Sequence, residues 1–290
     1  MQPGQRDARH GTELDGVALA RTAARLCAAA TVPWLHAEAA RRMAGRLVLM
    51  RRKPQLLLDW SGPLGGSGDL LRAAYPKARR QTVAIEGAPA RGASGRAQRR
   101  WPWPVRRGDA AVVTEAEVGP ESAQLVWSNM LLQACADPRA LLARWREALA
   151  VEGFLMFTTL GPGSLPELRA IYRAQGWGEP AQAFVDMHDL GDMLLVAGLA
   201  DPVMDQEMVT LTWSDVGAML AELRALGANL SPRRHQGLRT PHWREQLLQA
   251  LAATARDGRP CLSFELVYGH AFKAAPRAPV QLSKRKPDLP

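Results

Sequence analysis

The stretch LLLDWSGPLGGSGDLLRAAYP, residues 56–76, decides the fold that the sequence predicts. An apolar run that ends in Asp59 is followed by a glycine-rich turn and then by a helix-like segment. A strand feeding such a turn is a common way to bind a nucleotide, because the turn amides and the helix N-terminus attract negative charge. The stretch therefore predicts the first strand–turn–helix unit of a parallel α/β sheet.

The spacing of the glycines excludes the two commonest phosphate-binding motifs. They do not fall in the G-x-G-x-x-G register after Asp59, and no lysine follows them as in a G-x-x-x-x-G-K-[ST] loop. Glu86 follows the strand-like TVAI, where an acid accepts hydrogen bonds from ribose hydroxyls. Turn and acid together favour a nucleotide-type site. The alternative is a tight strand-to-helix turn that binds nothing.

Strands alternate with helices through the first half of the chain, which predicts parallel strands in one doubly wound sheet. Five strands are expected there, at 55–59, 81–86, 110–114, 123–128 and 153–159. The second half departs from this alternation, with expected helices at 164–175, 187–197, 214–226 and 240–255 and strands at 205–213 and 261–272. Seven strands, the last two out of simple alternation, favour the mostly parallel, Rossmann-like sheet of class I methyltransferases with helical cap insertions.

Helix boundaries are indicated by capping residues. Asp137 and Thr240 each precede a proline at the first helical position, and Ser214 is a candidate N-cap for the helix after it. Gly198 suits the C-terminal end of the helix that precedes it. The expected organisation is an N-terminal extension at 1–33, a catalytic domain at 34–273 with helical insertions at about 161–187 and 214–256, and a disordered basic tail at 274–290.

The amino-acid composition indicates which kind of binding partner and which cellular location to expect. The formal net charge of +9 comes mostly from arginine and favours an acidic partner, although a composition bias with no partner behind it would give the same charge. Cys27, Cys135 and Cys261 are widely spaced and form neither a disulfide framework nor a metal knuckle, so a reducing, cytoplasmic location is expected. No run of eighteen apolar residues is present, so no membrane span is expected.

Several blocks resemble one family. LLLDWSGPLGGSGDLL and TVAIE resemble the first two motifs of class I methyltransferases. LVWSNMLLQACADPRALLARWREALAVEGFLMFTTLGPGSLPELR resembles the central block of the malonyl-acyl carrier protein O-methyltransferases of biotin biosynthesis. HDLGDMLLVAGLADPVMDQEMVTLTW, MLAELRALGANL and VYGHAFK resemble the C-terminal half of that family. The resemblance covers about residues 32–273.

The resemblance implies methyl transfer from S-adenosylmethionine to the free carboxylate of a malonyl thioester on acyl carrier protein, an acidic partner. Such a carboxylate is already ionised, so the reaction needs alignment, a dry cavity and a positioning cation, but no general base. The residues that match the family's motif positions are the following. Asp59 is the first-motif acid, Gly62, Gly65, Gly66 and Gly68 form the turn, Glu86 binds ribose, Glu115 contacts adenine, and Ser128 and Asn129 face the methyl donor. Arg169 is the candidate for the acceptor carboxylate, with a helix-surface arginine as the alternative.

The first motif departs from the family's D-x-G-x-G-x-G, because Ser61 and Pro63 replace its first two glycines. Proline has no amide hydrogen to offer a cofactor. Gly65 and the glycines after it are therefore expected to form a shifted cofactor loop. The alternative is a catalytically degenerate protein that acts as a binding or assembly factor. A third interpretation, nucleic-acid binding through the arginine-rich segment 87–107 with Trp101 and Trp103, is disfavoured because no base-methylation motif is present.

Overall fold

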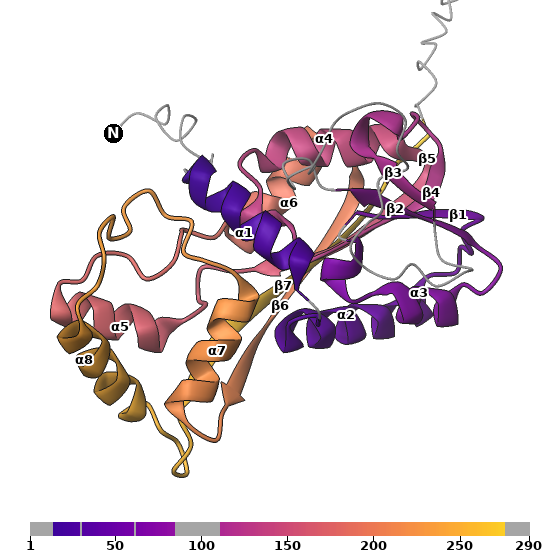
Figure 1. Ribbon diagram of the computed structural model, residues 1–290. Coiled ribbons are helices and arrows are strands. Elements are labelled where there is room, and N and C mark those ends of the chain that lie inside the picture. Colours follow the sequence, from indigo (N-terminus) through magenta and orange to yellow (C-terminus); the bar gives the residue numbers. More distant parts are fainter. Residues whose placement is uncertain (1–13, 30, 61, 85–110, 276–290) are drawn as a thin grey trace, which may run out of the picture.

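Seven strands form one mixed sheet in the order β3-β2-β1-β4-β5-β7-β6 (Figure 1). The computed structural model describes residues 14–29, 31–60, 62–84 and 111–275. The strands are β1 (Leu56–Asp59), β2 (Arg79–Ala84), β3 (Ala111–Thr114), β4 (Ala123–Asn129), β5 (Leu149–Leu160), β6 (Ala200–Thr212) and β7 (Cys261–Phe272). The first five are parallel, and β7 lies antiparallel between β5 and β6. The predicted class I methyltransferase sheet is confirmed.

The helices connect and cover these strands. The α-helices are α1 (Gly16–Ala28), α2 (Trp34–Arg46), α3 (Gly68–Ala74), α4 (Pro138–Ala148), α5 (Pro166–Gln175), α6 (Met187–Val196), α7 (Val216–Leu226) and α8 (Pro241–Ala252). The 3₁₀ turns are η1 (Leu47–Leu49), η2 (Gly62–Gly65), η3 (Glu115–Glu117) and η4 (Leu132–Ala134). From β1 the chain builds β2 and β3 outward on one side, and then returns to place β4 and β5 on the other. The carboxyl ends of β1 and β4 therefore flank the point where strand order reverses, which is where open α/β sheets bind ligands.

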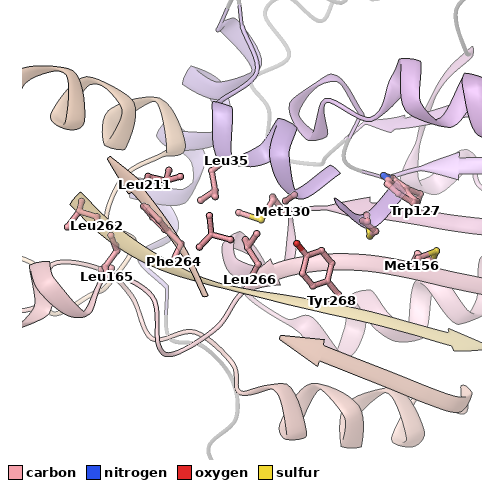
Figure 2. Packing of buried hydrophobic residues seen from close by; sticks show 14 of the residues in the cluster. Leu35, Trp127, Met130, Met156, Leu165, Leu211, Leu262, Phe264, Leu266 and Tyr268 are labelled. Carbon is pink, nitrogen blue, oxygen red and sulfur yellow. The ribbon is translucent and has the colours of Figure 1, made fainter. Parts of the chain in front are cut away.

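Apolar clusters on both faces of the sheet hold the layers together. One cluster joins Leu35 of α2 to Trp127, Phe264 and Tyr268 of the sheet (Figure 2). The other joins Trp60 and Trp145 to residues of α6. Most of β7 is buried, in keeping with its continuous apolar sequence, whereas β6 at the sheet edge alternates exposed and less exposed residues. The observed β5 and β6 begin earlier than the sequence predicted: Leu149 of β5 pairs with Ala123 of β4, and Ala200 of β6 pairs with Phe272 of β7.

One predicted helix cap is wrong and two are confirmed. The side chains of Asp137 and Thr240 accept hydrogen bonds from Ala140 N and Trp243 N, as expected of N-caps. At α7 the cap is Asp215 rather than Ser214. The Asp215 carboxylate accepts from Ala218 N at 2.8 Å, while the Ser214 hydroxyl donates to that carboxylate at 2.9 Å. A carboxylate one residue later reaches the free amides better than the hydroxyl does, and it also complements the helix dipole.

This correction gives a first prediction. Asp215→Ala should lower the Tm by a few degrees in differential scanning calorimetry, whereas Ser214→Ala should leave it nearly unchanged, because Ser214 supports the cap only indirectly. The Ala218 amide and the Ser214 hydroxyl lower the pKa of Asp215. The stabilisation by Asp215 should therefore be present above the usual aspartate range and fade as the pH falls through the lowered pKa. Equal losses from the two variants would contradict the assignment.

Residues before position 34 also contact the rest of the structure. Asp15 donates its backbone N–H to Leu230 O at 2.8 Å and accepts a hydrogen bond from Arg234 at 2.5 Å. The division at 33, like the other domain boundaries, stays a prediction. Several sequence predictions lie outside the described residues: the ends of the chain at 1–13 and 276–290, Ser61, Glu86 and the arginine-rich segment 87–107. Within the described ranges no helix is long and apolar enough to cross a membrane.

Candidate active site

The glycine turn after β1 is built around a buried acid. Asp59 is almost fully buried at the end of β1, and its Oδ1 accepts a hydrogen bond from Gly62 N at 3.1 Å. Gly62 begins the 3₁₀ turn η2, and Gly66 follows it with a φ of +66°. A Cβ on Gly66 would lie 2.9 Å from the Val32 side chain, so both its backbone angle and its surroundings favour glycine. The predicted turn thus lies at the end of β1 beside Asp59.

Asn129, at the end of β4, ties this turn to two other elements. Its Nδ2 donates to Gly65 O at 2.5 Å and to His36 O at 2.8 Å. Its Oδ1 accepts from the Thr158 hydroxyl at 2.6 Å. The turn, α2 and β5 therefore meet at one buried amide. The structure brings Asn129 together with the glycine turn, as predicted, but engages its side chain with the protein itself.

Two further side chains hold the turn, and the sequence did not point to them. Trp127 Nε1 donates to Ser67 Oγ at 2.7 Å, which fixes the residue before α3. His36 Nδ1 lies 3.0 Å from Leu64 O, so this nitrogen carries the donated proton. Burial lowers the pKa of His36, which keeps the imidazole neutral at neutral pH. Their only sequence signal was their position: Trp127 lies in the central block that resembles the family, and His36 lies within the range 32–273 that the resemblance covers.

Ser128 is a buried polar group that still lacks a partner. Its Oγ is enclosed at the end of β4, and within the described part of the chain it makes no hydrogen bond. Buried hydroxyls are normally satisfied, so an orphan beside a predicted ligand site favours a missing ligand or water. Together with the buried Asp59 and the glycine turn, it fits the demands of an S-adenosylmethionine site.

Glu115 lies farther along the same edge. It opens η3 directly after β3, whose last residue pairs with Ala84 of β2. The Glu115 carboxylate lies 4.0 Å from Arg144 Nε, and its carbonyl accepts from Arg144 Nη2 at 2.7 Å. These contacts hold the residue after β3 at the carboxyl edge, which is compatible with the predicted adenine contact.

A small pocket lies at the carboxyl ends of β4 and β5, beside the segment 161–187, which we call the cap. Leu132, Gln133, Thr159, Phe184 and Leu190 are among its lining residues, and we name it the edge pocket. The Arg169 guanidinium of α5 lies beside it, with its central carbon 5.8 Å from the Phe184 ring centroid. Arg169 therefore lies near the carboxyl ends of β4 and β5, although Arg169 itself does not line the pocket.

The Arg169 guanidinium is partly engaged by the cap. Its Nε and Nη2 donate to the carbonyls of Ser164 and Gln182 at 3.1 and 3.0 Å. Its Nη1 lies 3.8 Å from Glu179. Burial lowers the pKa of Arg169, and the Glu179 charge offsets this only in part. A partly desolvated cation beside a pocket is a candidate anion site, which supports the prediction that Arg169 binds a carboxylate. Carboxylate binding by Arg169 stays a prediction.

Comparisons with known proteins find relatives over most of the chain. No protein-family model matches the chain. Proteins named malonyl-[acyl-carrier protein] O-methyltransferase match most of it. The relative from Gallionella capsiferriformans is 38% identical over 250 residues, 84% of this chain and 85% of its own length. The relative from Laribacter hongkongensis is 38% identical over 251 residues, 84% of each chain. That from Halorhodospira halophila is 37% identical over 244 residues, 82% of this chain and 81% of its own.

Solved structures support the fold. A Bacillus halodurans crystal structure, provisionally assigned as a methyltransferase, has a TM-score of 0.52 at 11% identity. It covers 82% of this chain and 100% of its own. The YcgJ protein of Bacillus subtilis has a TM-score of 0.50 at 10% identity and covers 81% of this chain and 100% of its own. At such low identity these likenesses show the fold alone.

Proposed function

The chain belongs to the malonyl-[acyl-carrier protein] O-methyltransferase family, an S-adenosylmethionine-dependent family, and from this premise we propose the reaction that it catalyses. It transfers a methyl group from S-adenosylmethionine to the free carboxylate of a malonyl group on acyl carrier protein, a step of biotin precursor synthesis. The observation that carries the proposal is the identity of 38% over 84% of the chain, which spans both the turn and the cap.

The carboxyl edge of the sheet supplies the residues for the cofactor. We assign the glycine turn from Gly62 to Gly68 to the methionyl part, with Asp59 ordering the turn through the Gly62 amide. Ser128 and Asn129 lie at the methyl end, Glu86 is assigned to the ribose, and Glu115 to the adenine. The unpaired Ser128 Oγ supports this arrangement, because a bound cofactor would give it a partner.

The acceptor carboxylate needs positioning more than activation. The cofactor supplies an electrophilic methyl group, and a carboxylate is ionised at neutral pH, so this chain has no proton to remove. A cation that holds the carboxylate in line with the methyl group would supply the alignment, and we assign this role to Arg169. Its guanidinium stays charged although burial lowers its pKa. The apolar residues around the edge pocket would keep water away.

The partner proposed for this reaction is acyl carrier protein. The formal net charge of +9 would attract an acidic carrier and speed the encounter. The cytoplasmic location expected from the three separated cysteines belongs to this proposal as well.

The decisive experiment measures cofactor binding and product together. The full chain should bind S-adenosylhomocysteine in isothermal titration calorimetry. With S-adenosylmethionine and malonyl-acyl carrier protein it should form a methyl ester, visible by mass spectrometry as the mass of one added methylene. Binding without ester formation would refute the proposed acceptor. Absence of binding at high micromolar concentration would instead favour a degenerate methyltransferase fold, in which Ser61 and Pro63 disable the turn.

A further inference from the structure

Glu265 of β7 is a buried acid that the site described above does not use. Its side chain is buried, and its Oε2 accepts a hydrogen bond from Gly163 N at 2.5 Å. Across the described ranges no cation pairs with this carboxylate, and the Gly163 amide is its only hydrogen-bond donor. A buried carboxylate held by one backbone amide is costly to maintain, so the contact is a candidate for a functional role.

The loop at residues 161–165, between β5 and α5, is shaped around this acid. A Cβ on Gly161 or Gly163 would lie 2.5 or 2.8 Å from the Glu265 carboxyl atoms, so a larger residue at either position would have to displace the Glu265 side chain. Gly161 N donates to Glu265 O at 2.9 Å, and Glu265 N donates to the Ser164 hydroxyl at 3.1 Å. The backbone and the side chain of one residue therefore fix most of the loop.

The same loop holds Arg169 and, through it, the wall of the edge pocket. Ser164 O accepts from Arg169 Nε, and Arg169 Nη2 donates to Gln182 O. Gln182 Nε2 then donates to Gln133 O at 3.1 Å, and Gln133 lines the pocket. These hydrogen bonds form an unbroken sequence from β7 through the cap to η4, the turn that follows β4.

We propose that Glu265 is a positioning residue for the acceptor: it fixes the 161–165 loop so that Arg169 and Gln133 stand at the distance the malonyl carboxylate requires. This inference rests on the proposed function. The proposal predicts that loss of Glu265 affects acceptor binding and not cofactor binding. Asp59 and Asn129 hold the glycine turn through contacts that do not pass through Glu265.

The test uses the full chain with S-adenosylmethionine and malonyl-acyl carrier protein. Glu265→Ala should raise the KM for the acceptor about tenfold and leave the Kd for S-adenosylhomocysteine within about twofold. Glu265→Gln keeps an oxygen for the Gly163 amide and should restore most of the acceptor KM. Glu245→Ala removes an equal charge from an exposed position of α8 and should change neither constant.

A second variant keeps the test informative if Glu265→Ala fails to fold. Gly163→Ala pushes a Cβ against the carboxylate of Glu265, and it should raise the acceptor KM in the same way. In the Glu265→Ala background Gly163→Ala should add little, because the obstruction is gone. Fully additive effects, or a cofactor Kd that weakens in parallel with the acceptor KM, would overturn the proposal. A wild-type chain that binds cofactor but forms no ester would instead refute the proposed function, whatever the variants do.

Discussion

Asn129→Asp is expected to abolish S-adenosylhomocysteine binding and to lower the free energy of unfolding by about 3 kcal/mol or more. The substitution is nearly isosteric, but it replaces the Nδ2 group that donates to Gly65 O and His36 O. A carboxylate oxygen would face these two carbonyls at a position that is 1% exposed. Urea unfolding followed by tryptophan fluorescence measures the stability, and isothermal titration calorimetry measures the binding.

The pH dependence of this variant gives an internal check. A protonated carboxyl has one O–H to donate, so it can restore one of the two lost hydrogen bonds. Burial and the facing carbonyls should raise the pKa of the new carboxyl, because both disfavour its charged form. Relative to wild type, the variant should therefore recover stability as the pH falls toward that raised pKa. A stability deficit that does not change with pH would argue against carbonyl repulsion as its cause.

Gln124 offers the matched control, because its amide has the opposite surroundings. Its Oε1 accepts from Gln55 N at 3.1 Å and from Leu56 N at 2.9 Å, at the other end of β1. Gln124→Glu keeps an acceptor for both amides and should preserve stability and cofactor affinity. Wild-type affinity in Asn129→Asp, or equal losses in both variants, would contradict the role assigned to Asn129.

The sheet could be predicted because its signals are local. Most strands contain a short apolar run, and Asp59 with its glycines marks the turn in consecutive residues. The starts of β5 and β6 were missed because their pairing depends on residues distant in the sequence. Leu149 at the start of β5 pairs with Ala123 of β4, and Ala200 at the start of β6 pairs with Phe272 of β7.

The arrangement inside the site could not be predicted in the same way. That Asn129 faces the methyl donor stays a prediction, and the contacts of its amide with carbonyls 93 and 64 residues away in the sequence were not predicted. Glu265 and the 161–165 loop are about a hundred residues apart, and an acid within an apolar strand carried no local signal. Such contacts depend on which strands become neighbours, so the positions were predictable and the partners were not.

Arg169→Ala should lower kcat/KM for malonyl-acyl carrier protein about a hundredfold while the Kd for S-adenosylhomocysteine stays near the wild-type value. The loss would come from removing the cation assigned to the acceptor carboxylate. The difficulty is that Arg169 also holds the carbonyls of Ser164 and Gln182, so a purely structural loss must be separated from a loss of charge.

Arg169→Lys makes that separation. Lysine keeps the charge but lacks the planar fork that bridges the two carbonyls. If Arg169 binds the carboxylate, the lysine variant should recover part of the activity that the alanine variant loses. Raising the salt concentration should then increase the acceptor KM of the wild type and of the lysine variant. The same change in salt should increase the acceptor KM of Arg169→Ala less. If Arg169 only holds the cap, lysine and alanine should be equally impaired, with the same salt dependence. The role as carboxylate ligand would then pass to another residue, while Glu265 would still be expected to order the loop.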